Sequence, residues 1–267
     1  MLIGPRRASM KDSTPRALFN GGYKGVWYDF SDPSTMRSDA AGAQIADATG
    51  IYTLMDKSGN GNHLTQTTSG SRPTWDKAGY AGFVAASSQF MSRTDGIDFS
   101  PGGELPNQWS FMAWLSGASI GTTQYLFGLG SSASNNQVMA AGSNNTTAST
   151  LSAFIREDSG GASHSINVAI QTGAYGSTPQ MVSMTSVGPE TGARWQAWLG
   201  MTRSTVIAPA SYNGVHTFNR FALGALVRTT TSNYINANIY QFLLINRCLQ
   251  QDEISRTWND WKMRTGA

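Results

Sequence analysis

Short strand-like runs recur along this chain from Tyr23 onward, and they constrain its fold more than any other feature. Each run is rich in apolar and β-branched residues and is bounded by Gly, Pro, Asn, Asp or Ser. The twelve runs are residues 25–30, 51–55, 82–92, 109–116, 124–129, 137–141, 151–156, 165–171, 180–186, 195–202, 218–227 and 239–246. Because no long amphipathic helix separates them, the pattern predicts an all-β, antiparallel two-sheet sandwich.

One short helix is expected at the C-terminal end, over residues 252–261. Ile254, Trp258 and Trp261 stand at i, i+4 and i+7, which is the spacing of one buried helical stripe. Acidic residues at the start of the segment and basic residues toward its end complement the helix dipole. We expect this helix to cap the sandwich, with both tryptophans in the core.

Residues 56–63, Asp-Lys-Ser-Gly-Asn-Gly-Asn-His, predict a shaped loop after a strand. Gly59 and Gly61 can adopt positive φ, and the Asp, Ser and Asn side chains can bond to nearby backbone. One interpretation is a purely structural turn. The other is a calcium loop in which Asp56 and Asn60 supply oxygen ligands, although the spaced acids of an EF-hand loop are absent. The sequence leaves this choice open.

Several of these segments together resemble a known family. Residues 25–36 (GVWYDFSDPSTM), the 56–63 loop and residues 71–75 (SRPTW) are similar to the opening of concanavalin A-like, or laminin-G-like, jelly-roll domains of tailed bacteriophages and prophages. Residues 239–254 (IYQFLLINRCLQQDEI) resemble the closing strand and helix of that fold. The resemblance implies a jelly-roll sandwich in a virion protein. Between these ends only a generic strand rhythm is recognisable.

Composition indicates a neutral surface that forms hydrogen bonds. Only 13% of the residues are charged and 29 are Gly, while the net charge is +3. Nucleic-acid binding requires clustered Lys and Arg, so we expect no nucleic-acid partner. No apolar run reaches the ~20 residues that span a bilayer, so no membrane insertion is expected. The lone Cys248 cannot form an intramolecular disulfide, which is consistent with folding in a host bacterial cytoplasm.

Residues 1–24 differ in composition from the rest of the chain. Their basic residues are Arg6, Arg7, Lys11 and Arg16, against a single acid, and Gly and Pro interrupt any regular element. Such a segment is either a disordered tail or an arm that becomes ordered against a partner. We expect an arm that mediates particle attachment or oligomerisation, followed by one jelly-roll domain over residues 25–267.

Catalytic patterns are absent from the sequence. The four glutamates, Glu104, Glu157, Glu190 and Glu253, include no pair on one face of a strand-like run, as a simple retaining-glycosidase site would need. The three histidines are isolated from other metal ligands, and no Gly-x-Ser-x-Gly elbow lies between a strand and a helix. We therefore expect no enzyme and no cofactor, apart from the calcium alternative.

Carbohydrate binding remains a distinct alternative. Exposed aromatic rings stack on sugars, and aromatic residues near turns are candidates for this role. Trp75 and Tyr212 are the two we select, although aromatics in a sandwich more often lie in its core.

Taken together, the sequence predicts a non-catalytic structural protein of a phage or phage-like virion. It would be a head decoration protein or a tail-associated spike or fibre subunit. Its partners would be other virion proteins and further copies of itself, with host surface glycans as additional ligands. The alternative is a carbohydrate-binding host adhesin, followed by a polysaccharide-degrading enzyme on the same fold.

Overall fold

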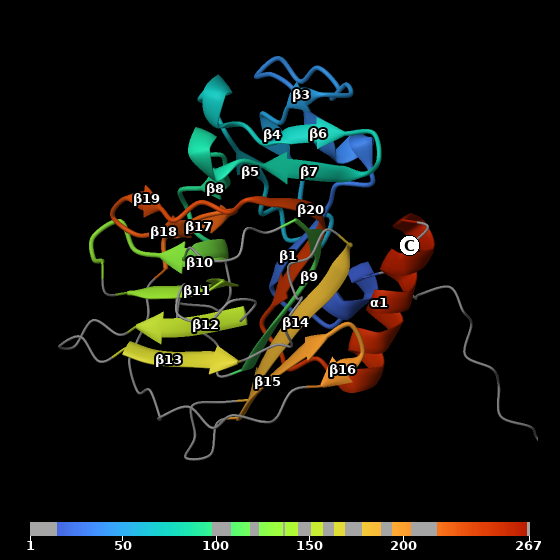
Figure 1. The fold of residues 1–267 in the computed structure, drawn as a ribbon, viewed down its shortest axis with the longest axis vertical. Helices are drawn as coiled ribbons and strands as arrows, with labels where there is room; N and C mark the ends of the chain where they lie inside the picture. The colour runs from blue at the N-terminus through green and yellow to red at the C-terminus, as the bar shows by residue number, and fades with distance from the viewer. Residues whose placement is uncertain are drawn as a thin grey trace, which may run out of the picture.

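The computed structural model describes residues 15–97, 108–117, 123–135, 137–143, 151–156, 163–168, 178–187, 194–203 and 218–265. Over these residues the chain forms two nine-stranded antiparallel sheets, here called sheet A and sheet B, with a two-stranded hairpin and one α-helix. The sheets pack face to face, and the helix lies beside sheet A (Figure 1). The predicted jelly-roll sandwich with a C-terminal helix is confirmed.

Sheet A has the order β16-β15-β14-β9-β20-β7-β6-β3, with β1 also paired to β20. Its strands are β1 (Gly25–Asp29), β3 (Thr49–Gly50), β6 (Thr74–Asp76), β7 (Tyr80–Phe83), β9 (Gln108–Ser116), β14 (Gln180–Val187), β15 (Arg194–Leu199), β16 (Thr202–Arg203) and β20 (Ala237–Ile245). The pairing of β1 with β20 joins segments from opposite ends of the chain.

Sheet B has the order β13-β12-β11-β10-β17-β8-β5-β4-β2. Its strands are β2 (Met36–Arg37), β4 (Thr53–Leu54), β5 (Leu64–Thr65), β8 (Met91–Arg93), β10 (Gln124–Gly130), β11 (Val138–Ser143), β12 (Leu151–Arg156), β13 (Ser163–Val168) and β17 (Arg220–Leu223). The hairpin is β18 (Leu226–Val227) with β19 (Thr231–Ser232), and the 3₁₀ turns are η2 (Pro15–Phe19), η3 (Pro33–Thr35), η4 (Ser69–Ser71) and η5 (Ala85–Ser87).

The main core lies between the two sheets. Alternate residues of β9 point into it, so that Phe111 and Leu115 are fully buried there, while Met112 and Trp114 face the other side of sheet A. Aromatic rings of the two sheets contact each other in this core. The ring centre of Phe127 in sheet B lies 5.3 Å from that of Phe242 in sheet A. Because alternate residues of each strand face the core, each sheet buries its apolar inner face only when the other sheet packs against it.

Helix α1 (Gln251–Thr265) covers the outer face of sheet A. Ile254 and Trp261 are fully buried against that face, and Trp258 is half-buried at its edge. The predicted buried stripe is therefore confirmed for Ile254 and Trp261, and the helix adds a third layer to the fold (Figure 1). No helix in the described part of the chain is long and apolar enough to cross a membrane.

Most predicted strand runs coincide with strands, but the run at 82–92 does not form one strand. It divides into β7 in sheet A, η5, and β8 in sheet B. Ser88 ends η5 in a left-handed conformation with φ of 50°, which turns the chain from one sheet to the other. The run at 218–227 also divides, into β17 and β18.

The predicted basic arm is described only from Pro15, and Arg6, Arg7 and Lys11 lie outside the described residues. The described part packs on the domain of its own chain. Phe19 is buried in the cluster under α1, and the Arg247 guanidinium lies over the Tyr23 ring at 4.8 Å. Arg16 is described and exposed, and the attachment role of the arm stays a prediction.

Candidate functional site

The 56–63 loop is organised around the buried carboxylate of Asp56. Oδ1 accepts hydrogen bonds from the backbone N–H groups of Trp27 and Ser58, both at 2.9 Å. Oδ2 accepts from the Ser58 hydroxyl at 2.7 Å and from the Asn62 N–H at 3.0 Å. The carboxylate thereby ties the loop to β1 of sheet A.

The other loop side chains reinforce this attachment. Asn62 Nδ2 donates to the carbonyl of Gly25 at 2.9 Å, and His63 Nδ1 accepts from the Asp56 N–H at 2.9 Å. The Tyr28 hydroxyl, whose pKa is raised by burial, donates to the Asn62 carbonyl at 2.6 Å. The loop thus has a structural role that requires no ion.

The calcium interpretation of the loop stays a prediction. Asn60 uses its Nδ2 as a donor to the Gly25 carbonyl at 3.2 Å, and both Asp56 oxygens already accept hydrogen bonds. Among the residues that the structure describes, no three His, Cys, Asp or Glu side chains gather as metal ligands would. An ion at Asp56 would therefore displace donors that now hold the loop.

An ion cluster links this loop to the rest of the domain. Lys57 Nζ lies 2.8 Å from Oδ2 of the fully buried Asp29 and 2.8 Å from Oδ2 of Asp32. Burial raises the pKa of Asp32, but hydrogen bonds from Lys57 and Ser34 outweigh it and hold that pKa below its ordinary value. The acids of this cluster serve in ion pairs, which favours a structural role.

Of the two sequence-predicted glycan residues, the structure describes only Trp75, and its ring is not exposed. Trp75 lies in β6 with only 8% exposure, and its Nε1 donates to the Phe30 carbonyl at 2.9 Å. This corrects the expectation of an exposed ring, because alternation in β6 turns Trp75 toward the main core. Tyr212 lies outside the described residues.

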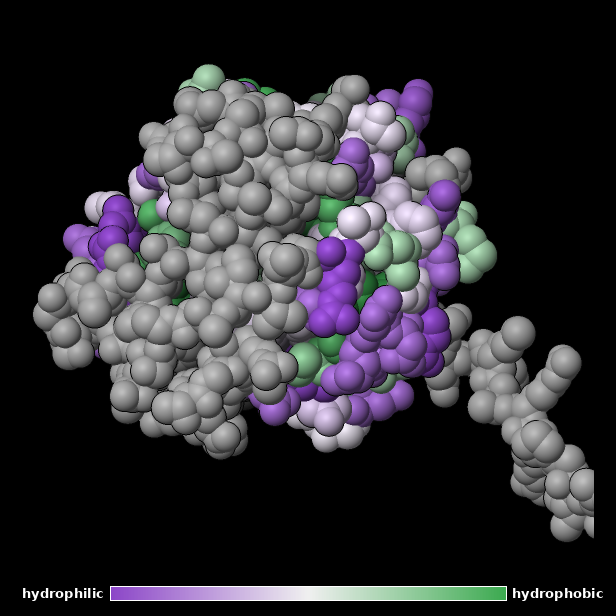
Figure 2. Space-filling view, turned by 60° about the horizontal axis from the view of Figure 1, so that its bottom comes forward, coloured by the Kyte–Doolittle hydropathy of each residue, from purple (hydrophilic) through white to green (hydrophobic). Residues whose placement is uncertain are grey.

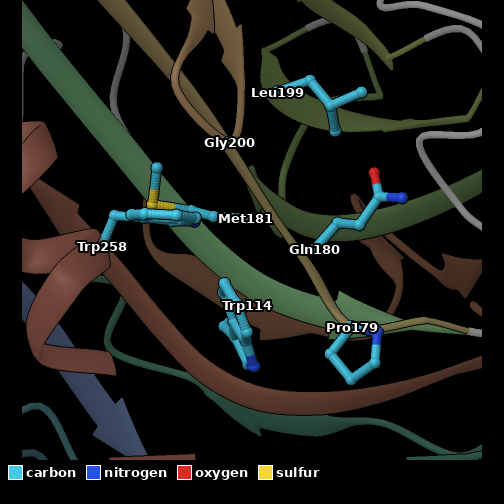
Figure 3. A pocket seen from close by; sticks show the side chains of 7 residues that line it. All are labelled: Trp114, Pro179, Gln180, Met181, Leu199, Gly200 and Trp258. Carbon is cyan, nitrogen blue, oxygen red and sulfur yellow. The ribbon is translucent and has the colours of Figure 1, made fainter. Parts of the chain in front are cut away.

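A hollow on the outer face of sheet A is a candidate binding site formed by described residues. It encloses about 240 Å³, and its lining is Trp114, Pro179, Gln180, Met181, Leu199, Gly200 and Trp258. Figure 3 shows Trp258 entering from α1, with Gln180 and Pro179 on the opposite side. Trp114 and Met181 are buried, whereas the other five lining residues are half-buried.

The hollow is uncharged and partly aromatic. Its lining contains no acid, histidine or base, and the single side-chain amide is that of Gln180. Lys262 stands outside the lining with its Nζ 5.1 Å from the Trp258 ring centre. In the view of Figure 2 the visible described residues show green areas separated by purple ones.

Sequence reasoning placed Trp258 entirely in the core, and the spacing contained no signal that its edge would be open. The predicted stripe is correct for Ile254 and Trp261. Trp258 packs against the same cluster, yet it also borders the hollow formed with β14 and β15. Only the pairing of strands distant in sequence makes that hollow.

Of the acids weighed for catalysis, Glu253 alone lies within the described residues. Both its oxygens accept from Arg247, at 2.7 and 2.8 Å, and Oε2 also accepts from the Gln250 N–H at 2.9 Å. Burial raises the pKa of Glu253, but the hydrogen bonds from Arg247 and Gln250 outweigh it and lower that pKa. This carboxylate caps α1 and does not line the hollow.

No protein-family model matches the chain, and no curated protein matches it in sequence. Solved structures do match. A botulinum neurotoxin type C chain, from a structure concerned with cell entry through two ganglioside molecules, aligns with a TM-score of 0.54 and 11% identity. That alignment covers 90% of this chain and 51% of the neurotoxin chain. The likeness is one of fold.

Two sialidase structures match over a smaller part of the chain. The CBM40 domain of the Ruminococcus gnavus IT-sialidase, bound to α2,3 sialyllactose, aligns with a TM-score of 0.47 and 13% identity, over 56% of this chain and 82% of that one. The NanB sialidase of Streptococcus pneumoniae aligns with a TM-score of 0.44 and 13% identity, over 56% of this chain. The match spans only 23% of the NanB chain.

Proposed function

We propose that this chain is a non-catalytic binding domain that recognises carbohydrate. The observation that carries the proposal is the hollow where Trp114 and Trp258 lie beside the amide of Gln180. An aromatic wall suits the apolar face of a sugar ring, and an amide can both donate to and accept from hydroxyl groups. A volume of about 240 Å³ is below the ~300–1,000 Å³ of typical ligand pockets and suits a single ring.

The fold likeness supports the same class of function. The neurotoxin to which this chain is similar enters cells through ganglioside molecules, on a fold that aligns over 90% of this chain. Turnover is not part of the proposal, because the lining of the hollow contains no carboxylate for acid–base chemistry. The described Asp29, Asp56 and Glu253 carboxylates are used in internal contacts.

A glycan panel tests this function directly. The full chain is applied to immobilised bacterial and host saccharides, and the affinity for any bound saccharide is then measured by calorimetry. For a neutral saccharide, Trp258→Ala should weaken that binding about ten-fold, which corresponds to ~1.4 kcal/mol of lost ring contact. Met263→Ala is the matched control, because Met263 lies on the same helix, is 77% exposed and does not line the hollow.

Two results would count against the proposal. A folded wild-type chain that binds no saccharide on the panel refutes carbohydrate recognition. Equal affinity of the wild type and Trp258→Ala for every bound saccharide removes the hollow as the site. Steady release of sugar products would instead establish the enzyme alternative.

A virion role is the second candidate function, and one observation favours it. Phe19 and Tyr23 fix the described start of the chain to the domain beside α1, and the basic residues Arg6, Arg7 and Lys11 precede this anchored stretch in the sequence. A basic segment anchored in this way suits attachment to a phage or phage-like particle. Deleting residues 1–14 should leave the melting temperature unchanged and abolish incorporation into the particle, and full incorporation of the truncated chain would refute this role.

A further inference from the structure

The outer face of sheet B has a narrow floor of small side chains on β11. Val138 and Ala140 are buried on that face, apart from the main core. Ala140 pairs with Phe154 of β12, and Val138 pairs with Arg156. Since cross-strand partners share a face, Phe154 and Arg156 form one side of this floor.

The β18–β19 hairpin forms the other side. Val138 pairs with Gly130 of β10, and a Cβ at Gly130 would lie 2.0 Å from the Val227 carbonyl oxygen and 3.2 Å from the Arg228 Cα. Glycine is therefore required at Gly130 for the hairpin to rest directly on β10. Arg220 fixes the position of Arg228, because its guanidinium donates to the Arg228 carbonyl at 2.9 Å.

Two guanidinium groups thus flank the same floor. Within the described residues, the side chains of Arg156 and Arg228 form no ion pair, and the Nε of each is buried without a hydrogen-bond partner. The described stretches 123–135, 137–143, 151–156, 163–168 and 218–232 contain no Asp or Glu, while Glu157 and Asp158, which follow Arg156 in the sequence, lie outside the described residues. Burial raises the pKa of Tyr125, while Arg228 and Arg156 oppose that rise, so both charges act on its hydroxyl.

Buried, unpaired guanidinium donors are costly, and a bound anion is one of the few arrangements that relieves the cost. Arginine is suited to planar carboxylates because it can donate two parallel hydrogen bonds. We propose that the outer face of sheet B binds a carboxylate-bearing saccharide, with Arg156 and Arg228 paired to its carboxylate. The site is separate from the hollow, which lies on the outer face of sheet A.

The neighbouring groups favour a saccharide over other anions. The half-buried rings of Tyr125 and Phe154 lie 5.5 Å apart beside the arginines and offer apolar contact to a sugar ring. The exposed Thr229 hydroxyl and Asn135 amide, joined by a 2.6 Å hydrogen bond next to Arg228, offer neutral partners for sugar hydroxyls. The choice of a saccharide as the ligand rests on the proposed function.

Binding of two acidic oligosaccharides, oligogalacturonate and oligosialate, to the full chain tests the site. The methyl ester of each serves as its matched neutral form. We expect at least one acid form to bind in low-salt buffer, to weaken as salt is added, and to lose affinity at least ten-fold on esterification. Arg156→Gln and Arg228→Gln should each lower that affinity at least ten-fold, and Arg156→Lys should lower it less.

Arg203→Gln is the control, because Arg203 is exposed on β16 of sheet A and the substitution removes the same charge. The melting temperature without ligand separates binding from structure. Removing an unpaired guanidinium should leave it unchanged or raise it, whereas a parallel fall in melting temperature and affinity would assign these arginines a structural role and overturn the proposal.

Other outcomes also overturn it: no binding of either acid form, equal binding of acid and ester, or equally tight binding of polyglutamate. The two proposed sites fail independently. Trp258→Ala should leave acidic-saccharide affinity intact, because Trp258 lines the hollow and not the sheet B site. Failure of the sheet B site therefore does not refute the hollow, and failure of the hollow does not refute the sheet B site.

Discussion

Replacing Asp56 with Asn tests whether one buried carboxylate holds the 56–63 loop on sheet A. The amide keeps the shape but substitutes an NH₂ for one oxygen that now accepts two hydrogen bonds. The less costly orientation places this NH₂ at the Oδ2 position, where the Ser58 hydroxyl can rotate to accept from it. The Asn62 N–H, now bonded to Oδ2 at 3.0 Å, then has no acceptor.

The magnitude follows from these contacts. One buried N–H without a partner costs ~1–3 kcal/mol, and the two remaining bonds, from Trp27 and Ser58, each lose about 1 kcal/mol when the acceptor is no longer charged. Asp56→Asn should therefore lower the free energy of unfolding by about 3–5 kcal/mol. Asp56→Ala, which removes all four bonds, should lower it at least as much.

Urea unfolding followed by tryptophan fluorescence measures this loss as a lower midpoint at constant slope. Asp95→Asn is the matched control, because Asp95 is exposed and has no side-chain hydrogen bond within the described residues. That control should change stability by no more than ~0.5 kcal/mol. If Asp56→Asn shifted the midpoint no more than Asp95→Asn, the central role of this carboxylate would be refuted.

Three further predictions concern the same framework. Gly61 has φ of 75°, so Gly61→Val should lower the free energy of unfolding by ~1–3 kcal/mol, which urea unfolding would detect. The pKa of Glu253 is held below its ordinary value of 4.5, so its contribution to stability is present above that pH and is lost as the pH falls through the lowered pKa. The stability difference between the wild type and Glu253→Gln should accordingly shrink on acidification, and a constant difference would contradict this. For the calcium interpretation, calcium should raise the melting temperature and Asp56→Ala should remove that response, whereas equal melting with calcium or chelator leaves only the structural turn.

The sandwich was predictable because most of its strands are local, period-2 patterns bounded by turn residues. The helix stripe of Ile254 and Trp261 was predictable for the same reason, since its spacing is contained in about two helical turns. The run at 82–92 was misread because apolar residues continue through η5, and the change of sheet depends on the left-handed Ser88. The left-handed backbone conformation of one serine cannot be predicted from the composition of the run.

Binding residues were harder to predict, because exposure depends on partners that lie far away in the sequence. Trp75 looked available beside a turn, yet β3 and β7 flank its strand and its indole N–H reaches Phe30. Trp258 looked buried, yet it borders a hollow completed by β14 and β15.

Arg156 and Arg228 illustrate the same limit on the other sheet. They are 72 positions apart and become neighbours only because Val138 pairs with both Arg156 and Gly130, and Gly130 lets the hairpin rest on β10. A larger residue at Gly130 would meet the Val227 carbonyl at once, so it should displace the hairpin and carry Arg228 away from Arg156. Gly130→Ala is therefore expected to reduce acidic-saccharide affinity without removing either arginine. Retention of full affinity in a folded Gly130→Ala variant would show that the hairpin does not position Arg228.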